Sequence, residues 1–187
     1  MDAAWAALNA RIEACQICAL VRNITHKVPG QGNPKARLLL IGEAPGAEED
    51  AQSLAFVGPA GQLLTRMLQA INLSREEVFI ANTLKCRPPG NRVPLPEETA
   101  ACLPFLREQT RLIRPGVILL LGATALKTVL GEDKRITRCR GQWVESKGVH
   151  ILPTFHPSAL LRDPGKKRPV WEDLQSLKAR LDSLGEG

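Results

Sequence analysis

The stretch "RLLLIGEAPG", residues 37–46, joins a short apolar run to a loop rich in glycine and proline. A continuous apolar run of this length is typical of a strand that is buried on both faces. Such strands occur in parallel sheets that carry helices on each side. In these sheets ligands bind beyond the carboxyl ends of the strands, so we expect a binding site at "GEAPG".

Further strand-like and helix-like segments follow in alternation. The expected strands are "RLLLIG" (37–42), "EVFIAN" (77–82), "GVILLLG" (116–122) and a pair, "GQWVES" (141–146) and "VHILPTF" (149–155). Apolar residues at helical spacing mark helices at 4–15, 60–71, 96–114, 123–130 and 171–184. The pattern predicts one domain over residues 1–187, a three-layer α/β/α sandwich around a mostly parallel four-stranded sheet.

Composition restricts the class of protein. The chain has 187 residues, of which 44% are hydrophobic and 24% are charged, which is typical of a globular fold. No apolar run reaches the roughly 18 residues of a membrane span, and no signal peptide is evident, so we expect a cytoplasmic protein without a membrane partner. A net charge of +6 favours a polyanionic partner.

Five cysteines need an explanation in a reducing compartment, where disulfides are rare. Cys15 and Cys18 form "CQIC", Cys86 lies in a proline-rich loop, and Cys102 lies in the next helix. A redox pair would open a helix after a strand, whereas "CQIC" ends the first helix. Zinc ribbons use two C-x2-C pairs, and the uneven spacing here modestly favours an iron–sulfur cubane. Buried structural thiols are the remaining alternative, and we expect that role for Cys139.

Four motifs occur in a fixed order: "GEAPGAEED" (42–50), "FVGPAG" (56–61), "NTLKCRPPGNR" (82–92) and "FHPSALLR" (155–162). Together with the cysteines, they resemble the family 4 uracil-DNA glycosylases, the iron–sulfur branch of that superfamily. The resemblance extends from Cys15 to "VWEDL" (170–174). It implies a monomeric enzyme that removes uracil from single- or double-stranded DNA. It also implies a 4Fe–4S cluster on Cys15, Cys18, Cys86 and Cys102.

Removal of uracil requires base flipping, recognition of the base edge and stabilisation of charge on O2. Phe56 would stack on the flipped base, unless it is a core residue. Asn82 would accept from uracil N3–H and donate to O4, unless it forms an Asx turn. His156 would donate to O2, and Glu43 would position water or stabilise the sugar cation. Backbone amides of the "GEAPG" loop would also donate to the base, at the expected substrate-binding residues Gly42, Ala44 and Gly46.

Two positions depart from related families of the superfamily. Ala44 replaces an aspartate that activates water, so charge stabilisation is expected to carry most of the rate. Gly46 stands where relatives use a tyrosine to exclude thymine, and the chain contains no tyrosine.

The segment after His156 is expected to face DNA. The expected DNA-binding residues are Arg87, Ser158, Leu160, Leu161 and Arg162. We predict that Leu160 is an exposed wedge that fills the gap left by the flipped base, with Leu161 as the next candidate.

Two other functions are possible. A branch of the superfamily binds uracil-DNA covalently through a histidine, but "GEDKRITRC" (131–139) contains no histidine. The chain could instead be a non-catalytic iron–sulfur or zinc module that binds nucleic acid. Release of free base from uracil-containing DNA distinguishes these possibilities.

Overall fold

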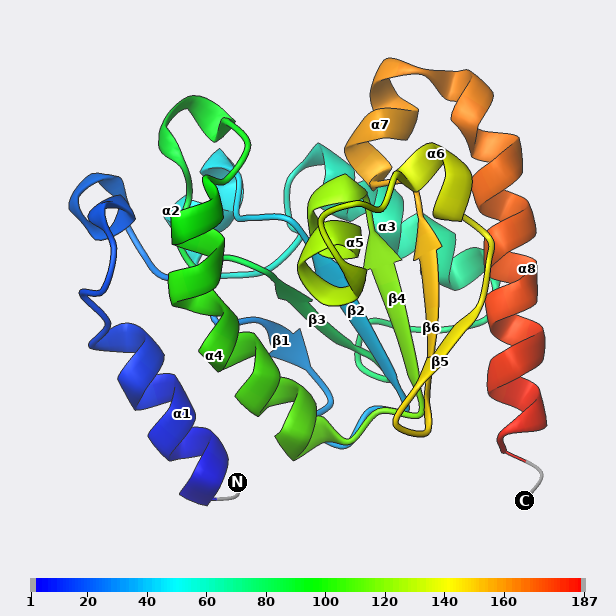
Figure 1. The fold of residues 1–187 in the computed structure, drawn as a ribbon, viewed down its shortest axis with the longest axis horizontal. Coiled ribbons are helices and arrows are strands. Elements are labelled where there is room, and N and C mark those ends of the chain that lie inside the picture. The colour runs from blue at the N-terminus through cyan, green and yellow to red at the C-terminus, as the bar shows by residue number, and fades with distance from the viewer. Residues whose placement is uncertain (1–2, 186–187) are drawn as a thin grey trace.

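The computed structural model describes residues 3–185, which form one mixed sheet with helices on both faces (Figure 1). The strands are β1 (Gln31–Gly32), β2 (Leu38–Gly42), β3 (Phe79–Asn82), β4 (Val117–Leu121), β5 (Val144–Ser146) and β6 (Val149–Thr154). The α-helices are α1 (Ala3–Glu13), α2 (Ala47–Gln52), α3 (Pro59–Ala70), α4 (Pro96–Ile113), α5 (Ala123–Leu130), α6 (Ile136–Cys139), α7 (Pro157–Arg162) and α8 (Lys167–Ser183). Short 3-10 helices are η1 (Ala19–Asn23), η2 (Pro89–Asn91) and η3 (Pro164–Lys166).

The sheet has six strands in the order β1-β3-β2-β4-β6-β5, so the expected number of four is wrong. The inner strands β3, β2, β4 and β6 pair in parallel, whereas β1 and β5 pair antiparallel at the two edges. Strand β1 has only two residues and shows no apolar run, which explains why the sequence did not reveal it. The expected pairing of "GQWVES" with "VHILPTF" is confirmed as β5 with β6.

Alternate residues of the inner strands enter different cores. On β2, Leu38 and Leu40 pack in a core with α3, α7 and α8. Leu39 and Ile41 pack in a second core with α1, α4 and α5. Helices therefore cover both faces of the sheet, as continuous apolar strands require (Figure 1).

Two helices differ from the sequence prediction. The buried stripe of α8 includes Leu174, Leu177 and Leu181, but Trp171 and Leu184 are 42% and 41% exposed at its border. The segment after His156, which is absent from the expected helices, folds into α7. Pro157 begins this helix, where a missing backbone N–H has no cost.

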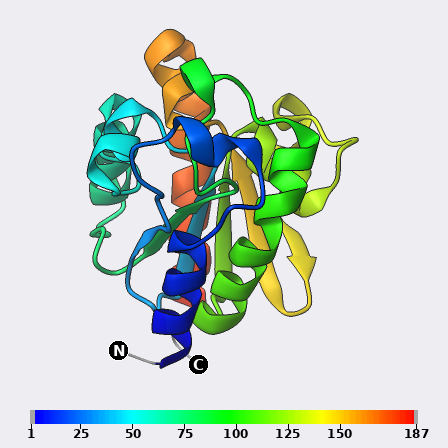
Figure 2. The same cartoon turned by 90° about the vertical axis from the view of Figure 1, so that its left-hand side faces the viewer.

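The carboxyl end of β2 is the switch point of the sheet. From β2 the chain passes to β3 on one side and then to β4 on the other. Such a point leaves a crevice where ligands bind. Figures 1 and 2 show α7 at this end of the molecule, whereas α1 begins and α8 ends at the opposite end. None of the helices in residues 3–185 has the length and hydropathy to span a bilayer.

Candidate active site

A cleft of about 410 Å³ opens at the carboxyl ends of the inner strands. Four separate parts of the chain line it: the loop after β2 with the start of α2, the segment around Phe56, the end of β3 with the proline-rich loop, and the start of α7. Of the expected site residues, it brings together Glu43, Ala44, Gly46, Phe56, Asn82, His156, Ser158 and Arg162. Gly42 is not among the residues that line it.

Phe56 is held in a strained conformation. Its φ is +54°, a left-handed value that a bulky residue rarely adopts. Arg75 fixes the backbone, because Nη1 donates to Phe56 O at 3.0 Å and Nη2 donates to Ala55 O at 2.6 Å. Helix α3 approaches closely at Gly61, where a Cβ would lie 1.8 Å from Phe56 O. These contacts keep the Phe56 ring 5.6 Å from the His156 ring, centroid to centroid.

Asn82 ends β3 with a buried side chain, 2% exposed. Within residues 3–185 its Oδ1 has no hydrogen-bond partner. A buried acceptor without a donor costs about 1–3 kcal/mol, so a ligand that brings an N–H is favoured. Gly42 keeps the adjacent space open, since a Cβ there would lie 2.5 Å from both Asn82 Oδ1 and Phe56 Cζ.

His156 presents a neutral ring to the cleft. Its Nδ1 accepts from Ser158 N at 3.1 Å, so the proton of the neutral ring is on Nε2. Burial, and next the charge of Arg162, lower the pKa of His156 to about 4, against a smaller opposite effect of Glu49. Gly122, at φ +90°, packs closely against His156, because a Cβ there would lie 2.9 Å from His156 Cβ.

Glu43 reaches the cleft from the loop after β2 and is held from two sides. Thr124 Oγ1, at the start of α5, donates to Glu43 Oε2. The Glu43 carbonyl accepts from Thr83 Oγ1 at 2.5 Å and from Leu84 N at 3.1 Å. The carboxylate therefore has a fixed position relative to Asn82 and His156.

Glu49 joins two loops of the cleft. Its Oε2 accepts from Gly46 N at 3.1 Å, and its Oε1 accepts from Val57 N and Gly58 N, both at 2.8 Å. In the sequence, Glu49 is only one of three consecutive acidic residues at the end of "GEAPGAEED". The hydrogen bonds of Glu49 to Val57 and Gly58 could not be predicted, because only the tertiary fold brings that loop near Glu49.

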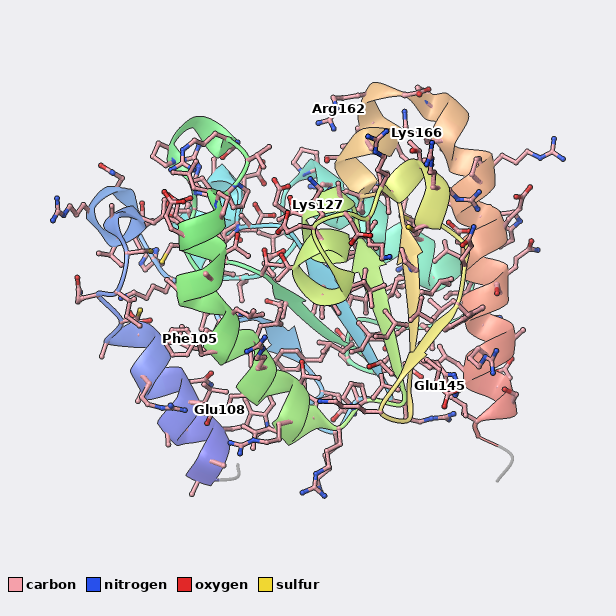
Figure 3. All side chains as sticks on the ribbon, in the orientation of Figure 1. Phe105, Glu108, Lys127, Glu145, Arg162 and Lys166 are labelled. Carbon is pink, nitrogen blue, oxygen red and sulfur yellow. The ribbon has the colours of Figure 1, made fainter. Side chains whose placement is uncertain are left out.

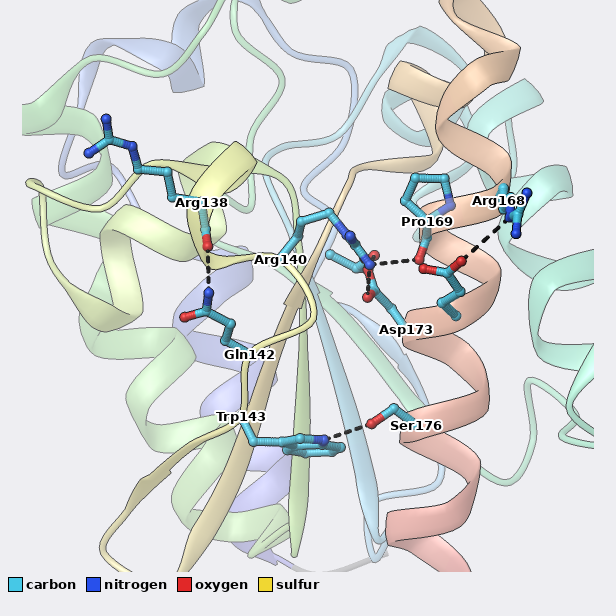
Figure 4. Close-up of polar contacts among 10 residues, drawn as sticks. Arg138, Arg140, Gln142, Trp143, Arg168, Pro169, Asp173 and Ser176 are labelled. Carbon is cyan, nitrogen blue, oxygen red and sulfur yellow. Dashed lines mark hydrogen bonds and ion pairs between the residues drawn. The ribbon is translucent and has the colours of Figure 1, made fainter.

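The end of β6, two residues before His156, is anchored to α8. Thr154 Oγ1 donates to Asp173 Oδ2 at 2.6 Å. Arg140 binds both oxygens of the buried Asp173 and donates to Pro169 O at 2.9 Å (Figure 4). This ion pair fixes the strand from which His156 enters the cleft.

The structure corrects the expected exposure of Leu160. In α7, neighbouring residues point in different directions, so Leu160 packs into the core with α3 and α8 and is only 2% exposed. Leu161 points outward and is 47% exposed. A buried side chain cannot enter the base stack, so Leu161 is the remaining candidate for the wedge.

The arginines near the cleft occupy different positions relative to it. Arg162 lines the cleft and projects from α7 at the open end of the molecule (Figure 3). Arg87 does not line it; its Nε donates to Asn91 Oδ1 at 2.7 Å within the proline-rich loop. Arg92 does line the cleft, but Glu98 binds it through two oxygens.

Cys15, Cys18, Cys86 and Cys102 line one pocket between the first helix, η1 and α4. Burial, and then the nearby Cys102, Cys18 and Cys15, raise the pKa of Cys86 to about 12, while Lys27 opposes this. In residues 3–185, no three Cys, His, Asp or Glu side chains are grouped closely enough to hold one metal ion. Cys139 lies elsewhere, on α6.

Lys85 was not singled out from the sequence, although it is fully buried, 1% exposed, between Asn82 and Cys86. Burial lowers the pKa of Lys85 to about 8, and the charge of Cys102 acts in the opposite direction. A lysine inside a proline-rich motif gives no sign of burial, so only the structure reveals it.

Comparison with known proteins identifies the class. The family model described as the uracil DNA glycosylase superfamily matches residues 29–175. The chain therefore belongs to the uracil DNA glycosylase superfamily.

Relatives narrow the assignment. The chain is 44% identical over 182 residues to the type-4 uracil-DNA glycosylase of Thermotoga maritima, covering 95% of each chain. It is 41% identical over 174 residues to that of Archaeoglobus fulgidus, covering 89% of this chain and 87% of the relative. It is 40% identical over 181 residues to that of Saccharolobus solfataricus, covering 92% and 84%. The chain belongs to the type-4 uracil-DNA glycosylases, as the sequence motifs predicted.

Proposed function

We propose that this protein flips uracil out of DNA and hydrolyses its N-glycosidic bond, leaving an abasic site. The observation that carries the proposal is the orphan acceptor of Asn82 in the cleft that His156 also lines. Buried polar groups normally find partners, and here a ligand with an N–H would supply the missing donor. The uracil ring has such a donor at N3.

Recognition of the base would follow from the orientation of the Asn82 amide, with its buried Oδ1 free to accept. Uracil N3–H donates to Oδ1, while the amide nitrogen donates to uracil O4. Cytosine carries no hydrogen at N3, so it would place an acceptor against the orphan Oδ1 and leave the buried group unpaired. Phe56 supplies an aromatic face for the flipped ring.

Bond cleavage leaves negative charge on uracil O2 and positive charge on the sugar. Nε2–H of the neutral His156 donates to O2 as its charge develops, while the hydrogen bond from Ser158 N keeps the ring in this tautomer. Glu43, held by Thr124, stabilises the sugar cation or orients the attacking water. Ala44 supplies no second carboxylate, so charge stabilisation carries most of the rate.

Cys15, Cys18, Cys86 and Cys102 are proposed to hold a 4Fe–4S cluster. Four thiols around one pocket, with one available for each iron, match the donor set of a cubane. The cluster would act as a structural cross-link between the segment after α1, the proline-rich loop and α4.

The outer contacts are proposed for DNA in either single- or double-stranded form. Leu161 would fill the base stack, and Ser158, Arg162 and Arg87 would bind phosphates. We propose further that residues 1–187 act as one domain and as a monomer in the cytoplasm.

Release of free uracil from a single-stranded oligonucleotide tests the proposal. The wild type should release uracil, and Asn82→Ala should lose most of this activity. Asn9→Ala, on α1, is the matched control and should keep wild-type activity. Tight DNA binding without any base release would instead identify a non-catalytic nucleic-acid-binding module.

A further inference from the structure

Lys85 is a buried cation without a carboxylate partner. Its Nζ donates to Asn82 O at 2.9 Å and to Gln109 Oε1 at 2.7 Å, and both acceptors are neutral. Gln109 is itself buried and donates from Nε2 to Pro29 O at 2.7 Å. Within residues 3–185, no Asp or Glu forms an ion pair with Lys85. Because an isolated buried charge is costly, an anion nearby would stabilise the charged form of Lys85.

The cysteine pocket is the anionic neighbour that the structure offers. Lys85 lines that pocket together with all four proposed ligands. Its backbone N donates to Cys102 Sγ at 3.3 Å. Four thiolates bring more negative charge than a 4Fe–4S core has positive charge, so a bound cluster leaves a net anion at this wall. The cation and the anion would then stabilise each other in a region with little water.

The same ammonium group also contacts the base-reading strand. It donates to the carbonyl of Asn82, the residue whose side chain carries the orphan acceptor. Lys85 thus links the two sites: its ammonium group donates to Asn82, the proposed base reader, and its backbone N donates to Cys102, a proposed thiol ligand.

We propose that Lys85 is the buried counter-charge of the cysteine site and the positioning residue that fixes Asn82. The proposal rests on the proposed cluster and on the proposed role of Asn82. It predicts that the charge of Lys85 governs how tightly iron is held, while its N–H donors govern how accurately Asn82 is placed.

Two substitutions separate these effects. Lys85→Met removes both the charge and the donors, whereas Lys85→Gln removes the charge but keeps an amide donor for Asn82 O. Lys178→Met, on the outer side of α8, is the control for loss of a lysine. Iron loss from the protein purified without oxygen is followed by absorbance after addition of a chelator. Single-turnover uracil release is measured separately on samples matched for iron content.

Both Lys85 variants should lose iron at least about tenfold faster than the wild type, because a buried charge loses its partner. Lys85→Met should also release uracil about tenfold more slowly at equal iron content, while Lys85→Gln stays nearer to the wild type. If Lys85→Met does not fold, the iron-loss rate of Lys85→Gln alone tests the role of Lys85 as counter-charge. Wild-type iron retention in the variants overturns the proposal. A wild type that contains no iron overturns the proposed cluster instead, and one without base release overturns the proposed function.

Discussion

The base cleft and the cysteine pocket lie at neighbouring parts of the molecule, but they are supported very differently. Phe56, in the cleft wall, belongs to a core of twenty buried apolar residues shared by the sheet, α3, α7 and α8. The cysteine pocket rests on a core of three buried residues, Leu20, Leu84 and Cys86. Ile17, between two of the cysteines, is 67% exposed. Packing can therefore shape the cleft without a ligand, whereas the cysteine pocket has little apolar packing and would gain most of its stability from the proposed cluster.

The strongest test of this difference is Cys86→Ala. The wild type should contain about four irons per chain, and the variant should contain almost none and lose solubility. Its melting temperature should fall by more than one alanine substitution explains, since the cross-link of the three segments is lost. Cys139→Ala is the matched control and should keep its iron. A fully active wild type with one zinc would exclude the cluster.

Substitution within the cleft should change the chemistry and leave the fold intact. His156→Ala should lower the single-turnover rate by about 10²–10³-fold, the usual effect of losing one donor to developing charge. Substrate binding should weaken much less, because the donor acts mainly in the transition state. His150→Ala, in β6, provides the control. Equal losses in binding and rate would indicate a ground-state contact.

Gly42→Ala tests whether the cleft shape is as fixed as the packing suggests. The added Cβ would collide with Asn82 Oδ1 and the Phe56 ring, so uracil release should fall by about 10²-fold. Gly116→Ala meets only ordinary contacts, the nearest at 3.7 Å, and should be nearly neutral. Unchanged uracil release in Gly42→Ala would show that Asn82 and Phe56 can shift to accommodate the added methyl group.

The two leucines of α7 should separate packing from DNA contact. Leu160→Ala should cost about 2–5 kcal/mol of unfolding free energy and slow release equally on all DNA forms. Leu161→Ala should leave stability within about 0.5 kcal/mol but slow release from duplex more than from single strands, by up to about tenfold. It should affect U·A pairs more than U·G pairs. Equal slowing on duplex and single strands would exclude Leu161 as the wedge.

A further test concerns stability as a function of pH. The pKa of His156 lies at about 4 in the folded protein, below its ordinary value of 6.5. The unfolded chain therefore binds the proton more readily, so this group contributes stability above pH 6.5 that is lost as the pH falls toward 4. The unfolding free energy of the wild type minus that of His156→Ala should increase as the pH rises from 4 to 6.5. A difference that does not vary with pH would show that the pKa of His156 is not lowered in the folded protein.

The sequence predicted those parts of the molecule that depend on runs and periodicity. The inner strands and the long helices were found because apolar residues repeat over enough positions. Helix α7 has six residues, too few to show a period, so Leu160 was placed on the surface. Resemblance alone pointed to the motif residues Phe56, Asn82 and His156, which line one cleft in the structure.

The contacts that hold the cleft residues in place could not be predicted from the sequence. Glu49 and Arg75 hold backbone atoms of neighbouring loops, and Gly122 packs against the Cβ of His156. Neither composition nor spacing encodes such partners. Lys85 is the same case, because its burial depends on α4 packing over the loop that contains it.

The position of the two ends of the fold has a practical consequence. Helix α1 begins and α8 ends at the end of the sheet that is remote from α7 and the cleft (Figures 1 and 2). An affinity handle, a fluorophore or a linker to a solid support joined at either end would point away from the cleft. The protein could thus be immobilised on a bead or an electrode with its cleft directed toward solution, which suits removal of uracil from amplified DNA in a flow format.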